Sequence, residues 1–299
     1  MNGSYQELKA GMKELAVLQN RLFRESELHG TRHVLPLAGR EIAVVFYPGA
    51  PTEPVLFCCY GGGFIMGSAA NDDACWAQLR ERLGVNLFSI NYRKAPEHPF
   101  PEPLYDVYDS IAYLEEHLAD FGVSSYDYSV FGFSAGGNLA AAVCLLDAQR
   151  GGKLQLRRQI LCYPYLDLAS SPKSKGHLES ERMIYTLFPE WYCADHDPRE
   201  ALISPVYAVE ECLSDLPRAI VCLGGSDPLH AEGARYVSRL TAAGTAVACH
   251  VAADMPHGYI ETAFQQPGPY LSEKATAQLL DGSIEKAKDE SIAFMKEQF

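Results

Sequence analysis

The feature that most constrains the fold of this chain is a serine flanked by glycines, at the junction of a predicted strand and a predicted helix. Segment 132–137 reads GFSAGG, with Ser134 between Gly132 and Gly136; it follows a short apolar run at 128–131 and precedes a helix-forming run at 138–149. A turn this tight strains the serine backbone and requires nearly bare residues two positions away, so that strand and helix can approach. The pattern is typical of a nucleophile elbow, which holds a hydroxyl above a sheet within reach of a base.

Strands alternate with helices along most of the chain. Apolar runs predict further strands at 41–47, 55–60, 85–92, 159–163, 218–223 and 246–251. Helical spacing and capping signals predict helices at 5–24, 72–83, 104–121 and 231–243, and one long last helix after Ser272. Asp72 and Asp73 are predicted to cap the second of these helices. This alternation indicates a mostly parallel central sheet flanked by helices on both faces. Segment 166–204 breaks the rhythm, because it is polar at first and then rich in aromatic residues, so we expect it to be an insertion.

Length, charge and cysteine content narrow the class of protein. The 299 residues suit a single α/β domain spanning 1–299, and a net charge of −13 argues against a nucleic-acid or anionic-membrane partner. The nine cysteines are odd in number and contain no C-x-x-C pair, which is typical of free thiols in a reducing compartment. The sequence shows no signal-peptide pattern and no apolar stretch long enough to cross a membrane. We therefore expect a cytoplasmic protein without a membrane partner.

A serine nucleophile needs a base and an acid that orients the base, in the chain order serine, acid, histidine. Among nine histidines, His257 stands out because it lies in the loop between the last predicted strand and the last helix. Asp227 directly follows a predicted strand, so it would lie at the carboxyl edge of the sheet, level with Ser134. Asp254 is a weaker candidate because it is too near His257 in sequence, and Glu232 is expected in the following helix.

A tetrahedral intermediate also needs amide donors for its oxyanion. Residues 61–63 are three glycines in succession after a buried strand, which suggests that backbone approaches a ligand there. The amide of Ala135, next after the serine, is expected to be another donor. A phosphate-binding loop is the competing interpretation, but neither of the glycine-rich phosphate-binding patterns is present.

At this point the chain resembles the hormone-sensitive-lipase-like group of α/β-hydrolases, which includes bacterial carboxylesterases and acetyl esterases. The resemblance runs from about residue 55 to the C-terminal helix and rests on six motifs in order: YGGG at 60–63, YRKAPEHPFP at 92–101, GFSAGG at 132–137, SP at 204–205, GSDPL at 225–229 and HGY at 257–259.

The resemblance implies the α/β-hydrolase fold and a role for each site residue. Ser134 would be the nucleophile, His257 the base and Asp227 its orienting acid. The oxyanion donors would be the amides of Gly62, Gly63 and Ala135. The family also implies a helical cap built from residues 1–30 and 166–204, and its members often form dimers through the last sheet edge, which makes a homodimer a candidate here.

Two positions depart from the family pattern. Tyr60 stands where the family usually has a histidine that helps to hold the oxyanion loop, and Phe133 stands where it usually has an acidic residue before the nucleophile. A tyrosine hydroxyl can still hydrogen-bond, but with a different reach. Neither change touches the predicted triad, so we expect activity to be retained and substrate choice and rate to be affected.

The leading hypothesis is hydrolysis of small, short-acyl esters through an acyl-serine intermediate, with cap aromatic residues forming an apolar pocket. An amidase of the same fold, such as an aryl-formamidase, would use the same triad and oxyanion hole. A hydrolase-like protein that only binds a small molecule is the third hypothesis, although relatives of that kind typically lose the base. No organic cofactor or metal is expected, since the histidines and cysteines lack ligand spacing.

Overall fold

The computed structural model describes residues 2–264 and 272–299 and places a single eight-stranded sheet at the centre of the molecule. The strand order across the sheet is β1-β2-β4-β3-β5-β6-β7-β8. The strands are β1 (Thr31–Leu37), β2 (Arg40–Tyr47), β3 (Val55–Cys59), β4 (Asn86–Ile90), β5 (Tyr128–Phe133), β6 (Leu156–Cys162), β7 (Arg218–Gly224) and β8 (Val247–Ala252).

Parallel pairing dominates the sheet, as predicted. Strands β4, β3, β5, β6, β7 and β8 pair in parallel, whereas β1 and β2 add an antiparallel end to the sheet. Every residue of β3, β4 and β5 is buried, which explains their continuous apolar sequences. The carboxyl ends of the parallel strands meet along one edge, where ligands bind in open α/β sheets.

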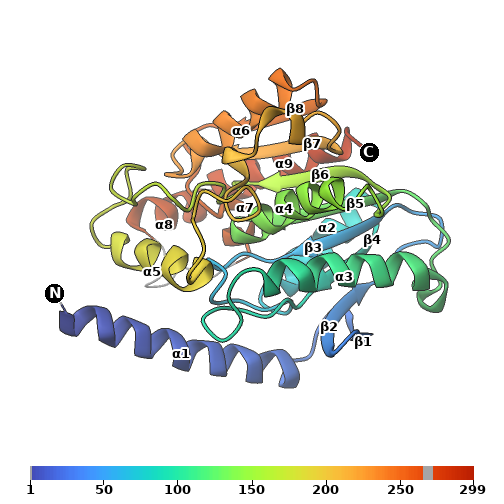
Figure 1. Cartoon of the computed structure of the whole chain (residues 1–299), viewed down its shortest axis with the longest axis horizontal. Helices are drawn as coiled ribbons and strands as arrows, with labels where there is room; N and C mark the ends of the chain where they lie inside the picture. The colour runs from blue at the N-terminus through green and yellow to red at the C-terminus, as the bar shows by residue number, and fades with distance from the viewer. Residues whose placement is uncertain (1, 265–271) are drawn as a thin grey trace.

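Helices cover both faces of the sheet (Figure 1). Helices α3, α4 and α6 lie on one face, with α3 packed against α4, while α2 and α9 pack together on the other. The helices are α1 (Asn2–Glu25), α2 (Asp73–Leu83), α3 (Glu102–His117), α4 (Ala135–Gln149), α5 (Arg182–Cys193), α6 (His230–Ala242), α7 (Tyr259–Thr262), α8 (Glu273–Leu280) and α9 (Ser283–Lys296). Three short 3-10 turns, η1 (Leu118–Phe121), η2 (Pro205–Tyr207) and η3 (Glu210–Cys212), complete the described elements.

Residues 166–204 and α1 lie outside these layers. In Figure 1 α1 runs below the sheet, and α5 lies beside its N-terminal half at the carboxyl edge of the strands. Glu190 joins the two helices, since its carboxylate accepts a hydrogen bond from Tyr5 and pairs with Lys9 at 2.5 Å. The insertion expected at 166–204 therefore carries one helix, α5, and contacts the N-terminal helix.

Three features differ from the predicted elements. Strand β1 was not predicted, and α4 begins at Ala135, directly after the serine, rather than at residue 138. The single helix expected after Ser272 is two helices, because Gly282 adopts a left-handed conformation with φ 80° between α8 and α9. The last two differences arise where a local backbone conformation, at Ser134 and at Gly282, decides the boundary.

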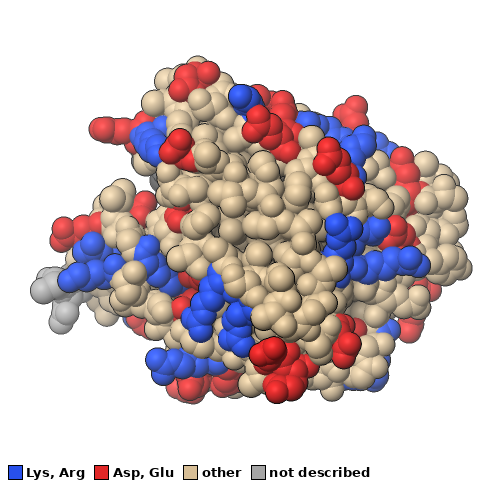
Figure 2. All heavy atoms as spheres, turned by 90° about the horizontal axis from the view of Figure 1, so that it is seen from above, with Lys and Arg blue, Asp and Glu red and all other residues tan. Residues whose placement is uncertain are grey.

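The surface mixes acidic and basic side chains. Figure 2 views the molecule from above, from the side of β8 and α6, and shows a central region without charged side chains and with both signs of charge around it. Among the described residues, no helix is both long enough and apolar enough to cross a membrane.

Candidate active site

The backbone of Ser134 is held in a strained conformation between β5 and α4. Its φ of 51° and ψ of −115° lie in a region that a residue with a side chain rarely adopts. The amide of Ser134 donates to the carbonyl of Cys162 at 3.0 Å, and its carbonyl accepts from the amide of Tyr165 at 3.0 Å. Hydrogen bonds to the end of β6 and the segment after it therefore fix the turn, as an elbow requires.

The glycines of the elbow are required by close backbone packing. A Cβ on Gly132 would lie 2.1 Å from the carbonyl oxygen of Gly136, and a Cβ on Gly136 would lie 2.1 Å from that of Cys59. A Cβ on Gly137 would meet Pro164 at 2.9 Å. These distances are all shorter than van der Waals contact, so the elbow can form only with glycine at these positions.

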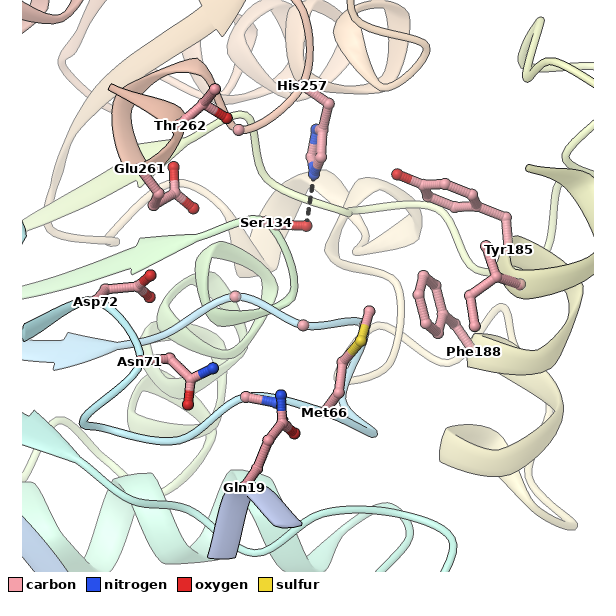
Figure 3. A pocket seen from close by; sticks show the side chains of 16 residues that line it. Gln19, Met66, Asn71, Asp72, Ser134, Tyr185, Phe188, His257, Glu261 and Thr262 are labelled. Carbon is pink, nitrogen blue, oxygen red and sulfur yellow. Dashed lines mark hydrogen bonds between the residues drawn. The ribbon is translucent and has the colours of Figure 1, made fainter. Parts of the chain in front are cut away.

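The structure brings together the three residues predicted as a triad. Nε2 of His257 lies 2.8 Å from Oγ of Ser134 (Figure 3), and Nδ1 of the same ring lies 2.8 Å from Oδ2 of Asp227. Asp227 follows β7 and is buried, with its other oxygen accepting the amide of Leu229 at 2.8 Å. One continuous hydrogen-bonded path thus joins hydroxyl, imidazole and carboxylate. Within the described part of the chain, the other acidic candidates, Asp254 and Glu232, make no hydrogen bond to the ring.

The surroundings of His257 stabilise the protonated form of its ring. Burial alone would lower the pKa of His257, but the charge of Asp227 and its hydrogen bond outweigh burial and raise the pKa above the usual value. The carboxylates of Glu261 and Glu232 act in the same direction. The ring can therefore accept a proton from Ser134 more readily than an isolated histidine could.

The glycine loop after β3 faces Ser134. Gly62 and Gly63 have φ values of 128° and 60°, which glycine adopts without strain, and a Cβ on Gly61 would lie 3.6 Å from that of Ser134. Among the described residues, the amides of Gly62, Gly63 and Ala135 donate to no protein acceptor. The structure thus leaves the three predicted donors available beside the serine.

Tyr60 holds the start of this loop in place of the usual histidine. Its ring stacks on that of Tyr92, with centroids 4.2 Å apart and an interplanar angle of 8°. Each hydroxyl donates to the backbone carbonyl of the other tyrosine at 2.9 Å. Both side chains are fully buried, so this reciprocal pair fixes the end of β3 against the segment after β4.

Phe133 does not line the pocket. Its fully buried ring stacks between Trp76 and Tyr163, with centroids 4.9 Å and 5.9 Å away. The Tyr163 ring also packs edge-on against His257 at 5.3 Å, and its hydroxyl donates to Glu261. Phe133 therefore supports the wall behind the triad instead of adding apolar surface to the cavity.

A cavity of about 360 Å³ opens above Ser134 and has two unlike walls. In Figure 3 Tyr185 and Phe188 lie on one side of the serine, and the acidic side chains of the polar wall, Asp72 and Glu261, lie on the other. The apolar wall is formed by Met66, Ile184, Tyr185 and Phe188. The polar wall is formed by Gln19, Asn71, Asp72, Glu261 and Thr262. Of the cap aromatic residues expected in an apolar pocket, Tyr185 and Phe188 line it, whereas Trp191 and Tyr192 do not.

Two carboxyl groups of the polar wall were not identified from the sequence. Asp72 occupies the N-cap of α2 as predicted, but its side chain makes no capping hydrogen bond. Burial and the charge of Glu261 raise the pKa of Asp72 to about 8, and burial also raises the pKa of Glu261. No spacing signal links residues so far apart in sequence, so only the fold shows that they share a cavity. In the described part of the chain, no group of three or more histidine, cysteine or acidic side chains could hold a metal ion.

The sequence also matches a known protein family over most of its length. The family model described as alpha/beta hydrolase fold matches residues 56–261. The chain belongs to the hormone-sensitive-lipase-like family of α/β-hydrolases. The matched range contains the elbow, the glycine loop and all three residues of the hydrogen-bonded path.

Relatives within the family include named esterases. The carboxylic ester hydrolase LipN of Mycobacterium tuberculosis is 33% identical over 71% of this chain and 58% of its own length. An arylesterase of Saccharolobus solfataricus is 36% identical over 62% of this chain and 61% of its own length. This chain therefore spans about three fifths of the length of these two relatives. A hyperthermophilic esterase from the archaeon Pyrobaculum calidifontis has a similar structure, with a TM-score of 0.74, 25% identity and coverage of 96% and 94% of the two chains.

Proposed function

We propose that this protein is a carboxylesterase that hydrolyses small esters through an acyl-serine intermediate. The observation that carries the proposal is the path of two 2.8 Å hydrogen bonds from Ser134 through His257 to Asp227, at the base of a cavity. This constellation activates a hydroxyl for attack on a carbonyl carbon. The esterase names of relatives in the same family support the same reaction class.

In the first half of the reaction, Oγ of Ser134 attacks the ester carbonyl while Nε2 of His257 accepts its proton. Asp227 keeps the ring oriented and stabilises its positive charge. The amides of Gly62, Gly63 and Ala135 stabilise the oxyanion that forms on the carbonyl oxygen. His257 then donates its proton to the leaving alcohol, and the acyl group stays on the serine.

In the second half, a water molecule attacks the acyl-serine from the position that the alcohol has left. His257 accepts a proton from this water, and the same amides stabilise the second oxyanion. Collapse of the intermediate returns the proton to Oγ of Ser134 and releases the acid. No step needs a group beyond these side chains, the amides and water.

The cavity favours substrates with a short acyl or alcohol group on one side. A volume of about 360 Å³ is at the lower end of the range for small-molecule sites. Phe188, Ile184 and Met66 would contact an apolar group, while Asp72 and Glu261 would face a polar one. We therefore propose small esters, with p-nitrophenyl acetate and butyrate as suitable assay substrates.

A serine-to-alanine pair tests the proposal. We expect Ser134→Ala to lower turnover of p-nitrophenyl acetate and butyrate by at least about 10³-fold, because it removes the nucleophile. Ser214→Ala is the matched control, since Ser214 is exposed and its hydroxyl hydrogen-bonds to Glu211 and Asp215 nearby in the chain, and it should keep wild-type turnover. Unchanged turnover in Ser134→Ala would exclude the mechanism. Faster hydrolysis of formanilide than of the esters would instead identify an amidase.

We also propose that the chain is one domain, 1–299, whose cap consists of residues 1–30 and 166–204. Gln19 from α1, together with Tyr185 and Phe188 from α5, contributes to the wall above Ser134. The contacts of Glu190 with Tyr5 and Lys9 support joint action of the two cap segments.

A homodimer through the edge strand β8 and a cytoplasmic location complete the proposal. Strand β8 is at the end of the sheet, and Figure 2 shows an uncharged central region on this side of the molecule. Light scattering should give twice the chain mass of 32.9 kDa, and a monomer mass would contradict the dimer. All nine cysteines are free thiols, which supports a reducing compartment.

A further inference from the structure

Cap helix α5 packs directly on the loop that carries the proposed oxyanion donors. We define this oxyanion loop as residues 60–67. The ring of Tyr192 in α5 stacks on that of Phe64 in the loop, with centroids 3.9 Å apart and an interplanar angle of 13°. Both rings are fully buried. The contact therefore joins the inner side of the cap to the backbone next to Gly63.

Phe64 has an unusual backbone conformation for its residue type. Its φ of 67° lies in the left-handed region, which bulky side chains rarely adopt. Such a conformation persists only where surrounding contacts determine it. The stacked ring of Tyr192 holds the side chain, and the amide of Ala95 donates to the Phe64 carbonyl at 3.1 Å.

The preceding residue, Gly63, also contacts α5. A Cβ on Gly63 would lie 2.4 Å from the ring of Phe188, so this ring occupies the space that a side chain would need. Two consecutive loop residues thus rest on two aromatic residues of the same helix. Both contacts lie next to the backbone that carries the amides of Gly62 and Gly63.

The two ends of the oxyanion loop have separate anchors. Tyr60 is fixed by its reciprocal hydrogen bonds with Tyr92, and the amide of Gly67 donates to the side chain of Gln19 at 2.7 Å. Between these ends, α5 supplies the aromatic support. Tyr192 is itself held in place, because its carbonyl accepts from the amide of Phe100 at 2.8 Å.

We propose that Tyr192 is a positioning residue for the oxyanion hole, which acts through Phe64 to aim the amides of Gly62 and Gly63 at the substrate. This inference rests on the proposed esterase function. Tyr192 does not line the cavity, so its effect cannot come from contact with substrate. The cap then has two tasks: Tyr185 and Phe188 shape the pocket, and Tyr192 sets the geometry of the loop below it.

The first test is the kinetics of Tyr192→Leu on p-nitrophenyl butyrate. We expect kcat to fall about tenfold and KM to change less than twofold, because donors that stabilise the transition state are misaligned while the substrate contacts remain. Tyr192→Phe keeps the ring and removes a hydroxyl that has no partner among the described residues, so it should restore most of kcat. Wild-type kcat in Tyr192→Leu would overturn the proposal.

Tyr236→Leu is a matched control for the loss of a buried tyrosine ring. Tyr236 lies in α6, is fully buried and, like Tyr192, has an unpartnered hydroxyl within the described structure. We expect this variant to lower Tm as Tyr192→Leu does, with kcat unchanged at a temperature well below unfolding. An equal loss of kcat in both variants would show a general structural effect and contradict the proposal.

A trifluoromethyl ketone provides a readout specific to the oxyanion. It forms a hemiketal with the serine, and its oxyanion would occupy the hole. We expect its Ki for Tyr192→Leu to rise in parallel with the loss of kcat, and an unchanged Ki would overturn the proposal. If the leucine variant does not fold, Tyr192→Met gives the same comparison at similar volume. Failure of the wild-type protein to hydrolyse the ester or bind the ketone would instead refute the esterase function itself.

Discussion

A proton on Nε2 of His257 would block transfer from Ser134, so the pKa of this ring sets the acid limit of activity. Burial lowers this pKa, but the charge and hydrogen bond of Asp227 outweigh burial and raise it above 6.5. As pH falls, the ring therefore becomes protonated and inactive at a higher pH than a free histidine would. We therefore expect activity to be lost on the acid side at a pH above 6.5.

The pH dependence of kcat/KM measures this limit. We expect the acid limb for the wild-type enzyme to have its midpoint above pH 6.5, the usual pKa of histidine. Asp227→Asn should lower kcat by roughly 10³–10⁴-fold and shift the midpoint to lower pH, because the ring loses the charge that stabilises its protonated form. Asp215→Asn, at an exposed position, is the control and should leave both values unchanged. A wild-type midpoint at or below pH 6.5 would contradict this account of the ring.

Tyr60→Phe tests the anchor at the start of the oxyanion loop. The change removes the hydrogen bond to the buried carbonyl of Tyr92 but keeps the stacked ring. Leaving this carbonyl without its donor should lower the free energy of unfolding by about 1–3 kcal/mol, measured by urea denaturation. Tyr126→Phe, at an exposed position, should change it by less than about 0.5 kcal/mol. Equal stability of the Tyr60 variant and the wild type would show that the hydrogen bond contributes nothing.

Single residues differ in how well the sequence predicted their positions. Ser134, Asp227 and His257 were predictable because each lies at a fixed point relative to a strand, and parallel strands bring such points to one edge. Asp72 was predicted only as a helix cap, because capping is the usual role of aspartate at the start of a helix. Its place in the cavity beside Glu261 depends on how the fold brings the start of α2 and helix α7 to the same cavity, which no local pattern records.

Helix α4 can begin directly after the serine because Gly132, Gly136 and Gly137 lack side chains where neighbouring atoms approach closely. The close approach of Gly136 to the carbonyl of Cys59 joins the start of α4 to the end of β3. This contact places the amide of Ala135 near the oxyanion loop. The elbow is thus a packing requirement of two elements as well as the position of a nucleophile.

Gly136→Ala tests this packing requirement. The new Cβ would lie 2.1 Å from the carbonyl oxygen of Cys59, so β3 and α4 would have to move apart. We expect a loss of at least about 3 kcal/mol in the free energy of unfolding, together with loss of esterase activity. Gly11→Ala in α1 is the control, since a Cβ there meets nothing within 4 Å, and it should be neutral or stabilise by up to about 1 kcal/mol. Wild-type stability in Gly136→Ala would contradict the packing argument.

At the level of elements, the sequence was informative for buried strands and less so for the edge strand β1 and the inserted segment 166–204. Strands β3, β4 and β5 are buried on both faces and read as apolar runs. Strand β1 escaped prediction because it is an edge strand with mixed burial that contains Pro36, so it lacks a clear alternation. The aromatic residues of α5 marked the insertion, but Pro189 inside the helix weakened its helical signal.

Across the whole molecule, several buried or half-buried carboxyl groups make the free energy of unfolding depend on pH. Burial raises the pKa of Asp72 to about 8 and those of Glu115 and Glu232 to about 7. In the unfolded chain these groups lose their protons near pH 4, whereas in the folded chain they keep them to higher pH. The folded state therefore binds more protons between these limits, and stability should fall as pH rises from about 4 towards 8.

Asp72→Asn isolates one of these contributions. The wild-type protein should lose on the order of 2 kcal/mol of stability from Asp72 between pH 6 and 8.5, and the neutral amide should remove this part of the loss. Chemical denaturation at both pH values measures the difference. Asp120→Asn, at an exposed position, should keep the wild-type pH dependence. An identical pH dependence in Asp72→Asn and the wild type would show that Asp72 is already ionised in the folded protein.

The site of covalent modification by a fluorophosphonate tests the central claim most directly, because this probe reacts with a serine activated as Ser134 is here. After incubation with the wild-type protein, peptide mass spectrometry should locate a single phosphonyl group on Ser134, in parallel with loss of hydrolysis of p-nitrophenyl butyrate. Ser134→Ala should remain unlabelled, and Ser214→Ala should be labelled like the wild type. A phosphonyl group on another residue, or loss of hydrolysis without modification of Ser134, would contradict the account.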